Sequence, residues 1–305
     1  MDVLKIENLS KQFGDHVVIN DLSFSVPEHS VFGFLGQNGA GKTTTMKIIL
    51  GLLKATSGKI TVCGEVVNYG ETKTNRFIGY LPDVPEFYSY MTPKEYLSLC
   101  GQITGLTTIQ IKHKSSELLE LVGLPNINRR IGGFSRGMKQ RLGIAQALLN
   151  EPKLLICDEP TSALDPLGRK EILDILSVAK AKTTVVFSTH ILSDAERICD
   201  RIAVLHNGKL ALSGSLSEVK ESRRHDSICL EFGSNKDAEN MVEEIKKISL
   251  VKDIKKMENV LTINVANLKE AGKIIIDLIS QNRIFITRYE VLEPSLESLF
   301  MEVVK

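Results

Sequence analysis

The fold of this chain is decided by the stretch Gly36-Gln37-Asn38-Gly39-Ala40-Gly41-Lys42-Thr43. It matches the pattern G-x-x-x-x-G-K-[ST], with an apolar strand predicted at 31–35 before it and a helix predicted at 42–53 after it. Glycines at these positions let backbone N–H groups turn inward around phosphate oxygens, and the helix start adds its positive dipole end. We therefore expect this stretch and Thr44 to bind a nucleoside triphosphate, with Lys42 on the β- and γ-phosphates and the Thr43 hydroxyl on Mg²⁺.

An acidic pair, Asp158 and Glu159, follows a second apolar strand predicted at 153–157. In a parallel sheet both motifs would lie at the carboxyl ends of the strands, where such folds bind ligands. Asp158 would then hold Mg²⁺, usually through water, and Glu159 would orient or deprotonate the attacking water. The structural alternative is a solvated turn after a buried strand.

The composition excludes several classes of protein. The 305 residues carry 38 Lys+Arg against 37 Asp+Glu, a formal net charge of +1, which argues against electrostatic capture of nucleic acid. The five cysteines are scattered without a CxxC, as expected in a reducing compartment. There is neither a long apolar run nor a basic, apolar leader at the start. A disordered, collagenous, secreted or membrane-spanning protein is therefore not expected.

The order of predicted elements indicates two domains. Residues 1–220 begin with β-rich runs and continue with alternating helices and strands, which predicts a covered, mainly parallel sheet. A polar linker is expected at 221–226. Residues 226–305 then have the order β-α-β-β-α-β of a small ferredoxin-like unit, with Pro294 opening a final helix.

A third motif, Phe134-Ser135-Arg136-Gly137-Met138-Lys139-Gln140-Arg141, lies upstream of the acidic pair. With this ordered set, residues 3–217 resemble the ATP-binding subunit of a bacterial ABC transporter of the drug, antibiotic or polysaccharide exporter type. The resemblance implies an α/β P-loop NTPase cassette with an antiparallel β subdomain and a helical subdomain, followed by the C-terminal α+β unit. Ser135 and Gly137 match the signature loop that meets ATP bound to the partner subunit. Two residues depart from that loop's usual form, Arg136 in place of a glycine and Met138 in place of a glutamine.

The resemblance assigns further residues. Asp165, in the segment 162–165, matches the loop that couples two ATP sites across a dimer, and His190 matches the histidine that contacts the γ-phosphate. Phe13 matches the aromatic that stacks on adenine, although a core phenylalanine would fit the sequence nearly as well. Asp83 stands where the family has a glutamine and is expected to contact Mg²⁺ or its water.

The function implied is a Mg²⁺-dependent ATPase on the cytoplasmic side of the membrane, attached peripherally to a separate permease. It would form a head-to-tail dimer, either a homodimer or a pair of different cassettes, and would bind no nucleic acid. The alternative is a soluble ABC-type ATPase switch acting on ribosomes or DNA. That alternative is disfavoured by the single phosphate-binding turn, the lack of a long heptad insertion and the neutral charge. The C-terminal unit would have a regulatory or dimer-supporting role.

Overall fold

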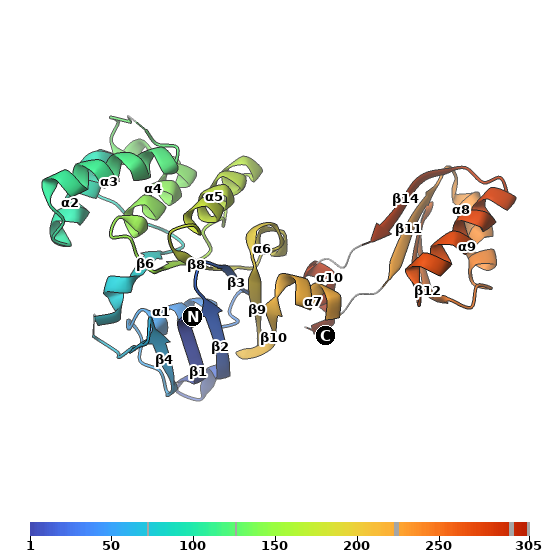
Figure 1. The fold of residues 1–305 in the computed structure, drawn as a ribbon, viewed down its shortest axis with the longest axis horizontal. Coiled ribbons are helices and arrows are strands. Elements are labelled where there is room, and N and C mark those ends of the chain that lie inside the picture. Colours follow the sequence, from blue (N-terminus) through green and yellow to red (C-terminus); the bar gives the residue numbers. More distant parts are fainter. Residues whose placement is uncertain (72, 126, 223–225, 293–295, 304–305) are drawn as a thin grey trace. The chain divides into compact units, whose positions relative to one another are not determined.

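The computed structural model describes residues 1–71, 73–125, 127–222, 226–292 and 296–303. Its internal contacts divide the chain into two compact units (Figure 1). The larger unit contains Met1–Ser217 together with Val303, and the smaller unit contains Glu218–Glu302.

The centre of the larger unit is a six-stranded sheet in the order β10-β9-β3-β8-β7-β6. All neighbouring strands run parallel except β10, which pairs antiparallel with β9, so the predicted mainly parallel sheet is confirmed. Every residue of β3, β7 and β8 is buried, as expected for strands covered on both faces. The strands are β3 (Val31–Gly36), β6 (Ile78–Leu81), β7 (Leu154–Cys157), β8 (Thr184–Thr189), β9 (Arg201–His206) and β10 (Lys209–Ser215).

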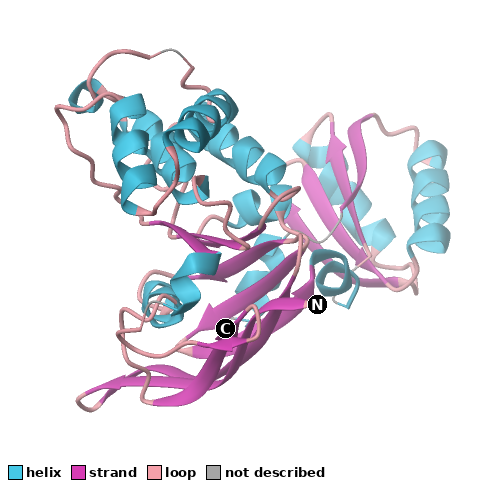
Figure 2. Ribbon diagram, turned by 60° about the vertical axis from the view of Figure 1, so that its left-hand side comes forward, coloured by secondary structure: helices cyan, strands magenta, loops and turns pink. Residues whose placement is uncertain are grey.

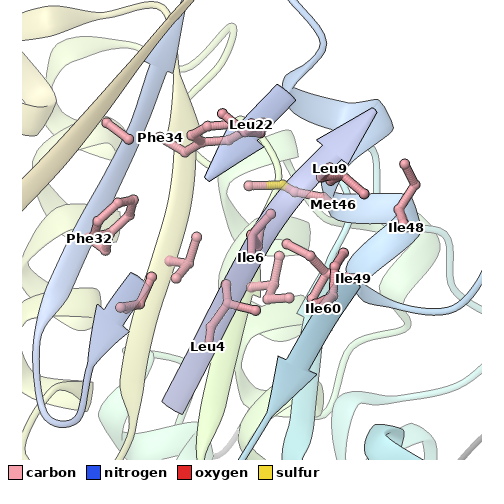
Figure 3. Close-up of a cluster of buried hydrophobic side chains, with 14 of the residues drawn as sticks. Leu4, Ile6, Leu9, Leu22, Phe32, Phe34, Met46, Ile48, Ile49 and Ile60 are labelled. Carbon is pink, nitrogen blue, oxygen red and sulfur yellow. The ribbon is translucent and has the colours of Figure 1, made fainter. Parts of the chain in front are cut away.

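A second sheet of the larger unit is antiparallel, in the order β2-β1-β4-β5. The strands of the chain are drawn in magenta in Figure 2. Its buried side chains, such as Leu4 and Ile6, share one apolar core with Phe32 and Phe34 of β3 and Met46 of α1 (Figure 3). This shared core fixes the turn between β3 and α1, which carries the phosphate motif. The elements are β1 (Asp2–Phe13), β2 (His16–Pro27), β4 (Ser57–Val62), β5 (Glu65–Val66) and α1 (Lys42–Ile49).

Three helices, α2 (Pro93–Ile103), α3 (Thr108–Leu121) and α4 (Arg136–Leu148), gather on one side of the larger unit (Figure 1). Helices α2 and α3 each begin with a capping box. The hydroxyl of the N-cap threonine accepts a hydrogen bond from the N–H of the third helical residue, and the Glu or Gln side chain of that residue accepts one from the N-cap N–H. The remaining helical elements of this unit are η1 (Lys73–Phe77), η2 (Ile131–Gly133), α5 (Pro166–Ala179) and α6 (Leu192–Ile198).

The structure differs from the sequence prediction in three places. The helix predicted at 42–53 ends at Ile49, because Gly51 adopts a positive φ of 69° that stops it. The β-branched and aromatic residues predict two separate strands, at 17–20 and 24–26, whereas the structure has one strand, β2, with a bulge at Asp21. The predicted linker, residues 221–226, overlaps a helix not expected from the sequence, α7 (Leu216–Ser222), and residues 223–225 lie outside the described residues.

The smaller unit has the predicted β-α-β-β-α-β order, and its antiparallel sheet runs β12-β13-β11-β14. Alternate residues of β13, including Leu261 and Ile263, are buried against the helices, whereas Thr262 points to the other face of the sheet. Pro294, expected to open the final helix, lies outside the described residues. The elements are β11 (Ser227–Phe232), α8 (Asn235–Ile245), β12 (Val251–Met257), β13 (Val260–Val265), α9 (Leu268–Gln281), β14 (Ile286–Leu292) and α10 (Leu296–Val303).

No helix within the described parts of the chain is both long enough and apolar enough to cross a membrane.

Candidate active site

The phosphate motif forms the turn between β3 and α1, as the sequence predicts. Gly39 and Gly41 adopt φ values of 82° and 107°, which residues with a Cβ rarely reach. A Cβ on Gly41 would also lie 3.0 Å from the carbonyl oxygen of Val18. Because Gly41 is the N-cap of α1 and supplies no side-chain cap, the first N–H groups of the helix are free of side-chain caps and suited to an anion.

Lys42 is folded onto its own turn. Its Nζ donates to the carbonyl oxygens of Gly36 at 2.7 Å and Gln37 at 3.2 Å, and its side chain is only 5% exposed. The ammonium group therefore lies inside the turn that would surround the phosphates, and a phosphate oxygen can replace the two neutral carbonyl oxygens to which it donates.

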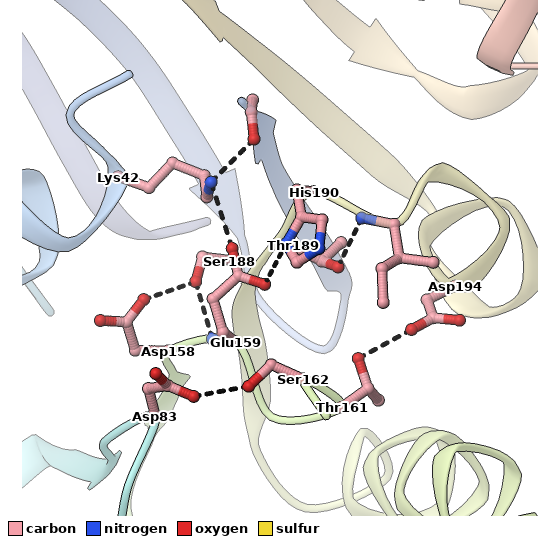
Figure 4. Close-up of polar contacts among 12 residues, drawn as sticks. Lys42, Asp83, Asp158, Glu159, Thr161, Ser162, Ser188, Thr189, His190 and Asp194 are labelled. Carbon is pink, nitrogen blue, oxygen red and sulfur yellow. Dashed lines mark hydrogen bonds and ion pairs between the residues drawn. The ribbon is translucent and has the colours of Figure 1, made fainter. Parts of the chain in front are cut away.

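The acidic pair lies at the carboxyl end of β7, beside the end of β8 (Figure 4). The buried carboxylate of Asp158 accepts a 2.6 Å hydrogen bond from the hydroxyl of Ser188. The same hydroxyl accepts the backbone N–H of Glu159 at 2.9 Å. Ser188 thus fixes both acidic residues relative to each other.

Glu159 joins the acidic pair to the phosphate turn. Its Oε1 lies 3.1 Å from Lys42 Nζ, and its Oε2 lies 2.9 Å from His190 Nδ1 (Figure 4). The Glu159 side chain is 13% exposed, so its contacts with these two basic side chains are largely shielded from water. Its backbone has a φ of 47°, in the left-handed region that is costly for a residue with a side chain.

The turn after Glu159 is held by a buried polar network. Thr161 Oγ1 donates to Asp194 Oδ2 at 2.7 Å, and Arg169 pairs with Asp194 Oδ1 at 2.5 Å. Because Asp194 belongs to α6 and Arg169 to α5, the network ties the positions of both helices to the loop that carries the acidic pair.

Asp83, just beyond β6, lies in a separate polar cluster. Its Oδ1 accepts from the hydroxyl of Ser162 at 2.6 Å and from Arg136 at 3.2 Å, and its backbone oxygen accepts from Gln140 at 2.5 Å. Arg136 also donates to Ser162 at 3.0 Å. Burial, together with the nearby carboxylates of Asp158 and Asp83, raises the pKa of Tyr80 to about 12, so its phenol stays neutral.

The other predicted site residues lie apart from this group. Ser135 caps α4 by accepting from the N–H of Met138, and Gly137 follows in the first turn. Asp165 caps α5, and Phe13 is 48% exposed at the end of β1 with Lys11 Nζ 4.5 Å from its ring centroid. The exposure of Phe13 rules out the alternative of a core phenylalanine.

Sequence reasoning missed two residues that organise the site. Ser188 and Asp194 connect the acidic pair and its following turn to β8 and α6. One signal was available for Ser188, since Ser188-Thr189 places two hydroxyls at the carboxyl end of an otherwise apolar strand. Asp194 carried no such signal, because an aspartate in the first turn of a helix is ordinary.

Oxygen donors at the carboxyl edge of the six-stranded sheet fit Mg²⁺. Thr43 supplies a hydroxyl, and Asp158 and Asp83 supply carboxylates from the ends of adjacent parallel strands. In the described ranges, no group of three or more His, Cys, Asp or Glu forms a complete metal cage. Mg²⁺ usually takes one or two protein carboxylates and completes its coordination shell with phosphate and water oxygens.

Two protein-family models match the chain, one in each unit. The family model described as "ABC transporter" matches residues 19–162, and the one described as "ATP-binding protein DrrA1-3-like, C-terminal domain" matches residues 214–304.

Several curated proteins match the chain along nearly its whole length. The uncharacterized ABC transporter ATP-binding protein YxlF of Bacillus subtilis (strain 168) is 40% identical over 303 residues, which cover 99% of each chain. The bacitracin transport ATP-binding protein BcrA of Bacillus licheniformis is 36% identical, covering 99% of this chain and 97% of that one. The linearmycin resistance ATP-binding protein LnrL of Bacillus subtilis (strain 168) is 33% identical, covering 99% and 98%.

Solved structures agree with the predicted cassette fold. An ATP-binding subunit of an ABC transporter is 35% identical, with a TM-score of 0.64 over 72% of this chain and 92% of that one. The cbiO1 protein of Clostridium perfringens, part of the ABC transporter complex cbiONQ, is 29% identical, with a TM-score of 0.67 over 72% and 90%. The fold class predicted from the sequence is therefore confirmed, and these relatives give no support to the ribosome or DNA alternative.

Proposed function

This chain belongs to the ATP-binding subunits of ABC transporters, which hydrolyse ATP to drive transport, and on that premise we propose how its residues do so and what they drive. The observation that carries the proposal is the position of Glu159, whose two carboxylate oxygens face Lys42 at 3.1 Å and His190 at 2.9 Å.

The backbone N–H groups of the turn and the start of α1 bind the phosphates, and Phe13 offers an exposed ring on which adenine stacks. Lys42 exchanges its carbonyl partners for the β- and γ-phosphate oxygens. This exchange also draws Lys42 away from Glu159 Oε1, so the carboxylate becomes free to accept a proton from water.

Hydrolysis is an in-line attack by that water on the γ-phosphorus. The bond to the bridging oxygen breaks, ADP leaves with the electron pair, and Glu159 receives the water's proton. His190 holds Glu159 Oε2 and contacts the γ-phosphate once nucleotide is bound. Thr43, Asp158 and Asp83 would hold Mg²⁺, which would supply positive charge to offset the negative charge of the phosphate oxygens.

The site is completed by a second subunit in a head-to-tail dimer, proposed as a homodimer. Ser135 and the first turn of α4 present a hydroxyl and backbone N–H groups of a helix start, which suit the γ-phosphate of nucleotide bound to the partner. Asp165, at the start of α5, lies beside that interface and couples the two sites.

The membrane partner is proposed to be a separate permease, which holds this subunit peripherally on the cytoplasmic side. A cavity of about 440 Å³, lined in part by Asp83, Pro85 and Phe87, lies between the Asp83 turn and the three-helix part of the larger unit. Next to it, Tyr88 and Tyr90 are more than half exposed, so apolar side chains of a partner can bury them.

Export is the proposed direction. Among relatives that match nearly the full chain, BcrA is named for bacitracin transport and LnrL for linearmycin resistance. We propose residues 1–220 as the cassette and 226–305 as an accessory domain with a regulatory or dimer-supporting role. The test is a chain truncated at Glu221. If it dimerises, hydrolyses ATP and supports transport as the full chain does, the proposed role of the accessory domain is wrong.

The catalytic proposal is tested with Glu159→Gln in the full chain. Turnover, measured as phosphate release with Mg·ATP, should vanish, while ATP should now hold a stable dimer in size-exclusion chromatography with light scattering. The matched control is Glu120→Gln on the exposed side of α3, which should hydrolyse ATP at the wild-type rate. Wild-type hydrolysis by Glu159→Gln would overturn the assignment of Glu159.

A further inference from the structure

Two residues that depart from the family's usual motifs contact each other. Asp83 stands where the ABC family usually has a glutamine, and Arg136 stands where the usual form of its signature loop has a glycine. They are separated by 53 positions in the sequence, yet Arg136 Nη2 lies 3.2 Å from Asp83 Oδ1.

The contact has a third member, Ser162. Its hydroxyl donates to the same Asp83 oxygen at 2.6 Å and accepts from Arg136 at 3.0 Å, so the three side chains form a closed triangle. Gln140, one turn along α4 from Arg136, holds the backbone oxygen of Asp83 at 2.5 Å. The triangle therefore connects the start of α4 to the Asp83 turn and to the loop that follows Glu159.

The environment makes this contact reversible. The side chains of Asp83 and Arg136 are 47% and 42% exposed, and an ion pair in such a setting stabilises a fold very little. A glutamine at position 83 would be neutral, whereas the carboxylate has a strong preference for a cation. In the structure, that cation is the guanidinium of Arg136.

We propose that Arg136 competes with Mg²⁺-bearing nucleotide for the carboxylate of Asp83. This rests on the proposed role of Asp83 at the metal. In the nucleotide-free state, Arg136 and Ser162 hold Asp83 Oδ1 on the α4 side. Binding of Mg·nucleotide draws the carboxylate to the metal and releases Arg136 at the start of α4. The start of α4 is thereby freed for the partner's phosphate only after metal-bearing nucleotide has bound.

The test measures ADP binding to the full chain by calorimetry, with Mg²⁺ and with EDTA, at a protein concentration where light scattering finds a single monomeric species. The quantity compared is the ratio of the two dissociation constants. Arg136→Ala should raise the ratio of the dissociation constant in EDTA to that in Mg²⁺ by about threefold, the size expected for releasing one exposed ion pair. Arg136→Lys should keep the ratio near the wild-type value. Lys139→Ala, which removes another positive charge from α4, is the matched control and should leave the ratio unchanged.

A second variant distinguishes competition from a general effect of charge. In Asp83→Asn the ratio of the ADP dissociation constant in EDTA to that in Mg²⁺ should be smaller than in the wild type. Adding Arg136→Ala to this variant should leave the ratio unchanged. Equal effects of Arg136→Ala with Mg²⁺ and with EDTA would overturn the proposal, as would a change that persists in Asp83→Asn. Failure of the wild-type chain to bind ADP at all would instead contradict the proposed nucleotide site.

Discussion

The hydroxyl of Ser188 donates to Asp158 Oδ1 at 2.6 Å while it accepts the backbone N–H of Glu159. One side chain at the end of β8 thus satisfies a buried carboxylate and a backbone donor of the acidic pair. If this hydroxyl is removed, the Asp158 carboxylate and the Glu159 N–H both lose a hydrogen bond, which makes Ser188 a positioning residue for the proposed water-activating group.

Ser188→Ala should destabilise the larger unit by about 1–3 kcal/mol, because it leaves a buried carboxylate oxygen and a backbone N–H without a partner. The turnover number for Mg·ATP should fall, since the acidic pair is no longer fixed. Thermal unfolding and phosphate release measure the two effects. Ser193→Ala, at the start of α6, is the control and should stay close to wild type; an unchanged melting temperature in Ser188→Ala would contradict the role given to Ser188.

His190→Ala should lower the turnover number by about a hundredfold, the lower end of the range for positioned acid–base groups, because Glu159 loses the side chain that holds its Oε2. The dissociation constant for ADP should change little, because the turn and Lys42 bind the phosphates without His190. Steady-state kinetics and calorimetry separate the two quantities. His113→Ala on α3 is the matched control, and a loss of ADP binding equal to the loss of turnover would argue against this division.

Gly41→Ala should weaken ADP binding by about tenfold or more, because the alanine must adopt a φ of 107° and its Cβ would lie 3.0 Å from the Val18 oxygen. The strain either distorts the turn or is relieved by moving it. Gly133→Ala is the comparison, since a Cβ there meets nothing within 4 Å. Equal affinities of the two variants for ADP would show that the turn does not depend on its glycines.

Ile263→Ala should destabilise the smaller unit by about 2–5 kcal/mol, because it leaves a cavity in that unit's buried core. The neighbouring Thr262→Ala, on the other face of β13, should cost less than about 1 kcal/mol. Calorimetric scans of the full chain with and without Mg·ADP identify the transition of the larger unit. Ile263→Ala should lower the unfolding temperature of the smaller unit alone. An equal fall in the temperature of the nucleotide-stabilised transition would show that the two units do not unfold independently.

Cysteine labelling should divide the thiols by burial. Burial raises the pKa values of Cys157 and Cys199, so the thiolate that reacts is scarce as well as shielded. Iodoacetamide at pH 8 should label Cys63 and Cys100, which are only half-buried, before it labels the other two. Peptide mass spectrometry gives the order, and urea should remove the difference; early labelling of Cys157 in folded protein would contradict the structure of β7.

The sequence predicted those features that depend on local pattern. The stretch from Gly36 to Thr43 has its glycines at fixed spacing, and the apolar run before Asp158 can only be a buried strand in such a fold. What it could not predict depends on pairing between distant segments. Nothing in the sequence states that Arg136 meets Asp83, and α7 was missed because polar residues dominate Leu216–Ser222.

The bulge at Asp21 shows the same limit within a strand. A polar residue between two apolar runs predicts a break, but β1 continues to pair with β2 on both sides of it. Only the partner strand decides whether an irregular residue interrupts a sheet or is accommodated by a bulge.

The left-handed backbone of Glu159, with a φ of 47°, has an evolutionary consequence. Glycine is the residue that this conformation favours, so a change of Glu159 to glycine would relieve strain where the glutamate stores it. A population selected for thermal resistance alone would drift toward that change and lose hydrolysis. Selection for hydrolysis would therefore have to retain the glutamate against a local cost in backbone free energy.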